Sequence, residues 1–220
     1  MPRSGVGSGA WGILGGTFDP IHYGHLALAE SAREELGLDG VLFLPAGLPA
    51  HKPDRVVTPA PERVAMVEAA IADNRAFRLS RLEVDRAGPS YAVDTVAQLV
   101  AAPPVAGADP DGFIWLMSSE ALAGLPDWHE PRRLLELTRV AVSARLGFPS
   151  PDRAWLTVKF PGLEERFVFL DGPELSHSAS RIRRLVGEGR SIRYLVPPAV
   201  EAYIHAHRLY LSDPRSTAPA

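Results

Sequence analysis

Residues 12–30 read GILGGTFDPIHYGHLALAE, which joins a short apolar run, a glycine pair and the start of a helical pattern. The apolar run at residues 11–14 predicts a buried strand that ends at Gly15 and Gly16. Apolar residues then recur at helical spacing through residues 24–36, so a helix is expected there. The stretch therefore predicts a strand, a turn containing glycine, and a helix.

The rest of the chain repeats this alternation of short apolar runs and helical patterns. Further strands are expected at residues 41–44, 77–84, 113–117, 140–143 and 167–170. Further helices are expected at residues 62–72, 92–100, 132–137, 180–188 and 200–207. This order is typical of a parallel sheet covered on both faces. We therefore expect an α/β fold, a Rossmann-like doubly wound parallel sheet with the C-terminal helices packed beside it.

Length and composition fit one hydrophobic core. The chain has 220 residues, of which 46% are hydrophobic and 22% are charged, which is too short for two large domains. The first ten and last nine residues are mostly small or polar. We therefore predict a single domain at residues 11–211, with flexible tails at residues 1–10 and 212–220.

Several classes of partner are disfavoured by the same composition. A net charge of -3 provides no basic field for nucleic acid or for an anionic membrane. The absence of cysteine excludes disulfides, thiolate metal sites and thiol catalysis, and it fits a reducing compartment. No apolar stretch approaches the length of a membrane span or resembles a secretory signal. We expect a cytoplasmic protein with no nucleic-acid or membrane partner, and a homo-oligomer stays open.

The glycine pair and the two histidines after it form a candidate phosphate site. Ligands of doubly wound sheets bind outside the carboxyl ends of the strands, where Gly15 and Gly16 lie. Missing side chains let a ligand approach the backbone, and N–H groups at a helix start can face an anion. His22 and His25 share one face of the first helical turn. Their imidazoles can hold phosphate oxygens and stabilise charge that develops on them.

Three other interpretations stay open from these residues alone. The two histidines could bind a metal, although no third ligand of a suitable kind lies nearby. The glycine pair could be a simple turn, and His22 could have a structural role. The stretch is neither a Walker A loop nor a dinucleotide-binding fingerprint, because both glycine patterns are absent.

Two segments resemble signatures of a known family. Residues 15–25, GGTFDPIHYGH, resemble the His-x-Gly-His nucleotidyltransferase superfamily, in the form typical of bacterial nicotinate-nucleotide adenylyltransferases. Residues 178–183, SASRIR, are similar to the family's Ser-x-Thr-x-x-Arg element, with Ser180 in place of threonine. From the residues alone, Ser178 or Ser180 can cap a helix. The free N–H groups at the start of that helix, together with Arg183, can hold an anion. In the family this element grips the ATP phosphates.

The resemblance extends over most of the chain. Residues 45–53 are similar to a Pro-x-x-x-Pro-Pro-His-Lys loop, in which Lys52 would suit a mononucleotide phosphate. Residues 88–95 resemble a Gly-Pro-Ser-Tyr-Thr-x-Asp-Thr segment that helps to recognise the pyridine nucleotide. Residues 125–128 are similar to a Leu-x-x-Trp segment whose aromatic ring packs on the pyridine. Residues 62–66 and 192–204 look like the family's next helix and its ending, and Arg63 is expected to be structural or ion-paired.

Two departures from the family pattern concern substrate binding. Ser118, Ser119 and Glu120 stand where the family has Gly-Ala/Ser-Asp, which contacts the adenosine ribose. Serine adds bulk at the glycine position, and glutamate reaches one methylene farther than aspartate. Ala92 replaces a threonine hydroxyl in the pyridine-recognition segment, and one lost hydrogen bond costs about 0.5–1.5 kcal/mol.

The resemblance implies adenylyl transfer from ATP to nicotinate mononucleotide, with Mg²⁺ entering on ATP, in NAD biosynthesis. It implies catalytic roles for His22, His25 and Arg183. The implied ATP-binding residues are Gly15, Gly16, Thr17, Phe18, His22, His25, Glu120, Ser178, Ser180 and Arg183. The implied mononucleotide-binding residues are Lys52, Tyr91, Thr95 and Trp128. No metal ligand from the protein is implied.

Two alternatives to this function stay open. The same chemistry could act on another phosphate acceptor, such as nicotinamide mononucleotide, an option that Ala92 leaves open. The chain could also be a nucleotide-binding protein that has lost catalysis. The departure at residues 118–120 supports that second alternative, and both histidines together with Arg183 count against it.

Overall fold

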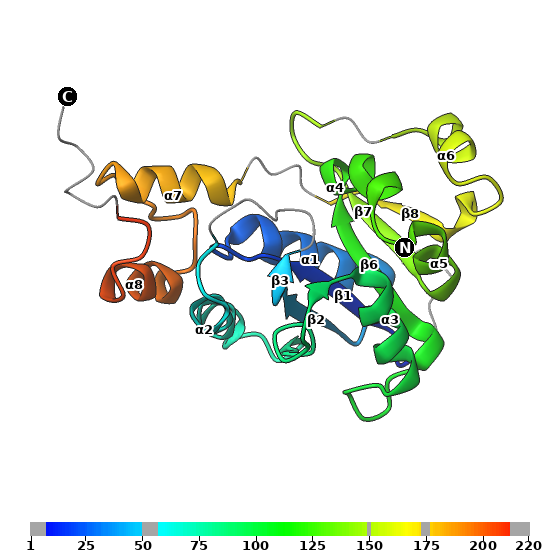
Figure 1. Ribbon diagram of the computed structural model, residues 1–220, viewed down its shortest axis with the longest axis horizontal. Helices are drawn as coiled ribbons and strands as arrows, with labels where there is room; N and C mark the ends of the chain where they lie inside the picture. The colour runs from blue at the N-terminus through cyan, green and yellow to red at the C-terminus, as the bar shows by residue number, and fades with distance from the viewer. Residues whose placement is uncertain (1–7, 50–56, 149–150, 173–176, 212–220) are drawn as a thin grey trace.

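The centre of the fold is a six-stranded parallel sheet in a computed structural model that describes residues 8–49, 57–148, 151–172 and 177–211. The strand order is β4-β2-β1-β6-β7-β8, and every pair of neighbours is parallel (Figure 1). The strands are β1 (Trp11–Gly16), β2 (Gly40–Pro45), β4 (Phe77–Leu79), β6 (Phe113–Ser118), β7 (Arg139–Ser143) and β8 (Phe167–Leu170). A separate parallel pair joins β3 (Leu48–Pro49) to β5 (Pro89–Ser90).

Helices cover both faces of the main sheet. Buried side chains of α1 (Tyr23–Leu36), α2 (Ala60–Ile71), α7 (Ala179–Gly187) and α8 (Pro198–Ala206) belong to one core cluster. Those of α3 (Ala92–Ala101), α4 (Ser119–Gly124), α5 (Pro131–Leu137) and α6 (Arg153–Lys159) belong to a second cluster. Figure 1 shows α7 and α8 together at the end of the molecule opposite to α6.

The strand sequences explain why two cores form. Successive side chains of a strand point to opposite faces of the sheet. Leu14 and Phe43 accordingly belong to the first core, while their neighbours Ile13 and Leu42 belong to the second. Because both faces are buried, β1 and β2 are continuously apolar, as parallel strands usually are. The predicted doubly wound α/β fold with C-terminal helices beside the sheet is confirmed.

Some local elements differ from the sequence-based expectation. The predicted strand at residues 77–84 ends at Leu79, because residues 82–88 turn back and bury Glu83. Helices α4 and α6, of six and seven residues, were not predicted. The short β3–β5 pair was also not predicted.

The packed part of the chain begins before residue 11. The N–H of Gly9 donates to Asp39 Oδ2 at 3.1 Å, and Gly9 O accepts from the N–H of Asp109 at 2.9 Å. Ala10 is only 1% exposed. Gly9 and Ala10 therefore belong to the fold rather than to a flexible tail, and residues 1–7 and 212–220 lie outside the described residues.

The direction of winding reverses between β1 and β6. The chain runs outward through β1, β2 and β4, and then returns to place β6, β7 and β8 on the other side of β1. Ligands of such sheets bind at the carboxyl ends of the strands beside this reversal. None of the helices in the described residues is long and apolar enough to cross a membrane.

Candidate active site

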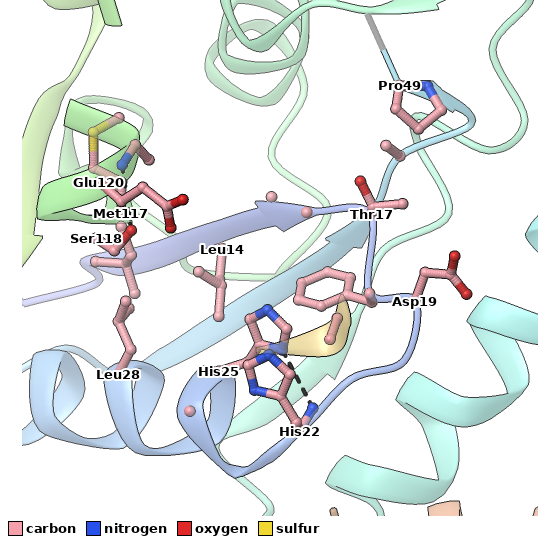
Figure 2. Close-up of a pocket in the computed structure, with 18 of the residues that line it drawn as sticks. Leu14, Thr17, Asp19, His22, His25, Leu28, Pro49, Met117, Ser118 and Glu120 are labelled. Atoms are coloured by element: carbon pink, nitrogen blue, oxygen red, sulfur yellow. Dashed lines mark hydrogen bonds between the residues drawn. The ribbon is translucent and has the colours of Figure 1, made fainter. Parts of the chain in front are cut away.

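A cavity of about 650 Å³ opens at the carboxyl ends of β1, β6 and β7, where the direction of winding reverses. It brings together residues from the starts of α1 and α7 and from the turn after β6. Eleven of the predicted site residues line it: Gly15, Gly16, Thr17, Phe18, His22, His25, Glu120, Trp128, Ser178, Ser180 and Arg183. Figure 2 shows several of these side chains around the end of β1.

The glycines at the end of β1 have an internal role as well as facing the cavity. A Cβ atom on Gly15 would lie 2.7 Å from the indole of Trp115, so only glycine lets that ring pack there. Phe18 follows with a φ of 49°, in the left-handed region that non-glycine residues rarely adopt. This turn directs the chain from β1 into α1 and places the two histidines beside the cavity.

His22 and His25 form an ordered pair at the start of α1. The N–H of His22, the N-cap residue, donates to Nδ1 of His25 at 3.2 Å. Their rings stack with centroids 3.7 Å apart (Figure 2). The rings of Phe18 and His25 form a T-shaped pair with centroids 5.0 Å apart. Because Nδ1 of His25 accepts a hydrogen bond, the neutral ring carries its proton on Nε2. The local fold therefore fixes both the orientation and the neutral tautomer of His25.

The surroundings of His22 keep its ring neutral. His22 is 6% exposed, and burial lowers its pKa well below the usual value, with further lowering from His25, His177 and Arg145. A neutral imidazole can still donate one hydrogen bond to a phosphate oxygen. Among the described residues, no group of three His, Cys, Asp or Glu side chains could hold a metal ion. The donors of this pair suit a phosphate oxygen, and the phosphate interpretation stays a prediction.

The lowered pKa of His22 predicts a loss of stability in acid. Between pH 7 and pH 5 the unfolded chain protonates His22 near its ordinary pKa of about 6.5, whereas the folded chain does not. The unfolded state then binds more protons, so stability falls as pH falls through this range. We expect the melting temperature to drop less over this range in His22→Gln than in the wild type.

The matched control for this measurement is His205→Gln, because His205 is an exposed histidine of α8. Its drop in melting temperature should equal that of the wild type. The lowered pKa of His177 contributes in the same direction, and the raised pKa of Glu83 in the opposite direction. Both act equally in all three proteins, so an unchanged drop in His22→Gln would contradict the prediction.

The second signature segment docks on the first. Arg183 of α7 donates from Nη1 to the carbonyl oxygen of Asp19, and Nη1 lies 3.8 Å from Asp19 Oδ2. Its Nη2 donates to Ser180 Oγ at 3.1 Å. Ser178 occupies the N-cap position of α7, but its hydroxyl makes no capping hydrogen bond within the described residues. The start of α7 and the guanidinium of Arg183 thus face the same cavity as the histidines.

Arg145 and His177 are among the cavity residues that the sequence analysis did not predict. Arg145 follows β7, forms an ion pair with Glu120 and donates from Nη2 to the carbonyl oxygen of His177 at 3.1 Å. The ring of His177 stacks at 6.0 Å from that of His22. Arg145 could have been found from its place after a strand, by the same rule that located Gly15. His177 carried no comparable signal beyond its position next to Ser178.

The departure at residues 118–120 has a structural basis. Ser118 lines the cavity and caps α4, because its Oγ accepts from the N–H of Ala121 at 3.3 Å. Ser119 is fully buried and donates from Oγ to the carbonyl oxygen of Phe148 at 2.7 Å. Glu120 lines the cavity, paired with Arg145. Ser119 therefore supports the turn after β7, whereas Ser118 and Glu120 face the ligand space.

Of the predicted mononucleotide-binding residues that the structure describes, only Trp128 lines the cavity. Trp128 lines the cavity and packs edge-on against Trp115 at 6.1 Å. Tyr91 is not among the residues lining the cavity, and its ring stacks on His129 at 4.2 Å. Thr95 is also absent from the lining and is fully buried. Lys52 lies outside the described residues.

Thr95 is connected to the cavity through Glu83, which was not predicted as a site residue. Its Oγ1 donates to Glu83 Oε1 at 2.7 Å and accepts from Arg86 Nη2 at 3.0 Å. Glu83 lines the cavity, is 4% exposed, and has a pKa raised by that burial. Thr95 thus does not line the cavity, but it donates to the carboxyl group of a residue that does.

Comparisons with known proteins identify the family of this chain. Residues 13–185 match the family model described as cytidylyltransferase-like. A probable nicotinate-nucleotide adenylyltransferase of a Roseiflexus species is 45% identical over 199 residues, which cover 90% of this chain and 96% of that protein. A protein with the same description from Dehalococcoides mccartyi is 40% identical with the same coverage.

Solved structures share the fold at low sequence identity. The nicotinic acid mononucleotide adenylyltransferase of Plasmodium falciparum, solved as a complex with NaAD, is 21% identical with a TM-score of 0.72. The alignment covers 91% of this chain and 97% of that one. With the family model and the relatives above, the sequence-based resemblance is confirmed. The chain belongs to the nicotinate-nucleotide adenylyltransferase family of cytidylyltransferase-like nucleotidyltransferases.

Proposed function

We propose that this enzyme transfers the adenylyl group of ATP to nicotinate mononucleotide, with release of pyrophosphate. The observation that carries the proposal is the meeting of His22 and His25 with Ser180 and Arg183 in one cavity beside the winding reversal. Hydrogen-bond donors and a fixed cation there suit a polyphosphate. The names of the curated relatives support the acceptor.

In the proposed reaction, a phosphate oxygen of the mononucleotide attacks the α-phosphorus of ATP in line. The new P–O bond forms as the bond to the pyrophosphate oxygen breaks, so no covalent intermediate with the protein is needed. Positioning and charge stabilisation supply most of the catalysis in such chemistry. Mg²⁺ that enters bound to ATP would neutralise charge on the phosphate oxygens.

We assign the ATP-side roles from the cavity geometry. His25 donates from Nε2 to an oxygen of the reacting phosphate, and neutral His22 supports it from the same turn. Arg183, together with Ser178, Ser180 and the N–H groups that open α7, holds the β- and γ-phosphates. Glu120, in the first turn of α4, accepts from the ribose hydroxyls in this proposal. The backbone groups of residues 15–18 contact the nucleotide.

The acceptor-side roles follow the sequence-based prediction, except that Thr95 is no longer assigned a direct contact with the mononucleotide. We propose that Trp128 packs on the pyridine ring and that Lys52 binds the acceptor phosphate. Tyr91 contributes by holding its segment beside the cavity. Thr95 acts through Glu83, since it contacts that carboxyl group and not the cavity. The lack of cysteine in the sequence supports a reducing compartment such as the cytoplasm.

Pyrophosphate release with ATP and Mg²⁺ against a panel of acceptors tests the function. Turnover should be fastest with nicotinate mononucleotide. Turnover with nicotinamide mononucleotide alone would contradict the proposed acceptor while keeping the reaction. ATP binding with no turnover on any acceptor would contradict catalysis and favour a nucleotide-binding protein.

A further inference from the structure

The turn after α8 has a strained backbone, and the side chain of Tyr210 is half-buried there. Arg208 and Tyr210 have φ values of 52° and 62°, in the left-handed region that non-glycine residues rarely adopt. The N–H of Leu209 donates to the carbonyl oxygen of Ile204 at 3.0 Å, which closes the turn. Tyr210 thereby packs against the first core, with its hydroxyl oxygen 3.9 Å from Met66 Sδ. Strain of this kind persists where surrounding contacts compensate for it.

The contact that Tyr210 gains is with Asp19 of the first signature segment. The hydroxyl of Tyr210 donates to Asp19 Oδ1 at 2.7 Å. Asp19 is 4% exposed, and its other oxygen, Oδ2, accepts from the N–H of Thr58 at 3.4 Å. Burial and the charge of Asp19 raise the pKa of Tyr210, which keeps the phenol protonated as the donor. The carboxylate is therefore held from two sides by groups outside its own segment.

Asp19 in turn holds the arginine of the second signature segment. Both its carbonyl oxygen and its Oδ2 face Nη1 of Arg183, whose side chain is 19% exposed. Figure 2 shows Asp19 pointing away from the histidine pair. Asp19 and Arg183 both line the cavity. The carbonyl oxygen of Asp19 accepts the direct hydrogen bond, and Oδ2 places the carboxylate charge 3.8 Å from the same Nη1.

We propose that Tyr210 is a positioning residue, which holds Arg183 in its ATP-binding orientation through Asp19. The inference rests on the proposed function for the role of Arg183. It joins the end of the described chain to the ATP phosphates without any contact between Tyr210 and substrate.

The backbone around Asp19 is fixed independently of Tyr210. Arg63 is 1% exposed and donates to the carbonyl oxygens of Thr17 at 2.7 Å and Thr58 at 2.8 Å. These two carbonyl groups lie on the segments that carry Asp19 and its donor, the N–H of Thr58. Loss of the Tyr210 hydroxyl should therefore release side chains rather than unfold the site.

Tyr210→Phe tests the proposal by comparing ATP with the acceptor. We expect the Kd for ATP with Mg²⁺, measured by calorimetry without acceptor, to rise about 3- to 10-fold, as expected for one lost hydrogen bond. The KM for nicotinate mononucleotide should stay within about twofold of the wild type, because its assigned residues lie elsewhere. The matched control is Tyr203→Phe, since Tyr203 also donates to a carboxylate, Glu62 Oε2 at 2.9 Å, from the same end of the chain. Its ATP affinity should be that of the wild type.

A double-mutant cycle shows whether the effect passes through the arginine. In an Arg183→Lys background, Tyr210→Phe should weaken ATP binding by less than about twofold, because the group it positions is gone. An unchanged ATP affinity in Tyr210→Phe, or equal weakening of ATP and acceptor together with a lower melting temperature, would overturn the proposal in favour of a purely structural role. A full additional effect in the lysine background would overturn the route through Arg183.

These readouts separate this proposal from the proposed function. A wild-type protein that binds ATP but releases no pyrophosphate would contradict the function, while the ATP affinities of the variants would still test Tyr210. A wild-type protein that binds no ATP would contradict both.

Discussion

His25→Ala should lower the rate of pyrophosphate release by about 10²- to 10⁴-fold while the protein stays folded. The mutation removes the ring whose Nε2 we assign to the reacting phosphate. The fold should survive because His25 is only partly buried and lies at the first turn of α1, where its Nδ1 accepts from the N–H of His22. Steady-state release of pyrophosphate, with circular dichroism and a melting curve on the same sample, measures both effects.

Two further variants separate chemistry from capping. In His25→Asn the side-chain oxygen can replace Nδ1 as acceptor for the N–H of His22, but nothing replaces Nε2. We expect this variant to be as stable as the wild type and as slow as His25→Ala. His205→Ala, on the exposed side of α8, should keep the wild-type rate. Near wild-type turnover in folded His25→Asn would remove His25 from the catalytic assignment.

Arg63→Met should lower the free energy of unfolding by about 3–5 kcal/mol, the range for breaking a buried charged contact. Arg63 is among the largest fully buried side chains of the described residues, and burial lowers its pKa. It donates to the carbonyl oxygens of Thr17, Ala46, Gly47 and Thr58. Methionine fills similar space but leaves these acceptors without their donor, and each unsatisfied buried group is costly.

Urea denaturation measures this loss, and an arginine of the surface provides the control. Arg81 is exposed and pairs with Asp85 four residues later, so Arg81→Met should leave the unfolding midpoint nearly unchanged. The unfolding midpoint of Arg63→Lys should lie between those of the wild type and Arg63→Met. A lysine ammonium group cannot donate to all four carbonyl groups as the planar guanidinium does. A wild-type midpoint in Arg63→Met would show that the guanidinium contributes nothing net to stability.

Much of the fold could be predicted because most of its strands and helices show a clear apolar pattern along their length. The strands of the main sheet and helices α1, α2, α3, α7 and α8 were located within a few residues. Errors occurred where periodicity was too short or misleading. Helices α4 and α6 have six and seven residues, and the segment around Glu83 keeps the alternation of a strand while it forms a turn.

The site shows the same division between local and distant information. The histidine pair and Arg183 were predicted from local segments with recognisable spacing, and all three line the cavity. Their catalytic roles stay predictions until tested. Thr95 was predicted to bind substrate, but it contacts Glu83 behind the cavity wall. No spacing in the sequence indicates that residues 83 and 95 meet.

The sequence by itself determined most of the alternation of strands and helices along the chain and the glycine turn, and it predicted the chemistry of the two signature segments. These features depend on backbone preference and on neighbours within one turn, so they are encoded locally. Only the tertiary structure decided that Asp19 joins Arg183 to Tyr210, and that Glu120 pairs with Arg145. These contacts join segments 25 to 191 residues apart, which only the packing of helices on the sheet brings within hydrogen-bonding distance.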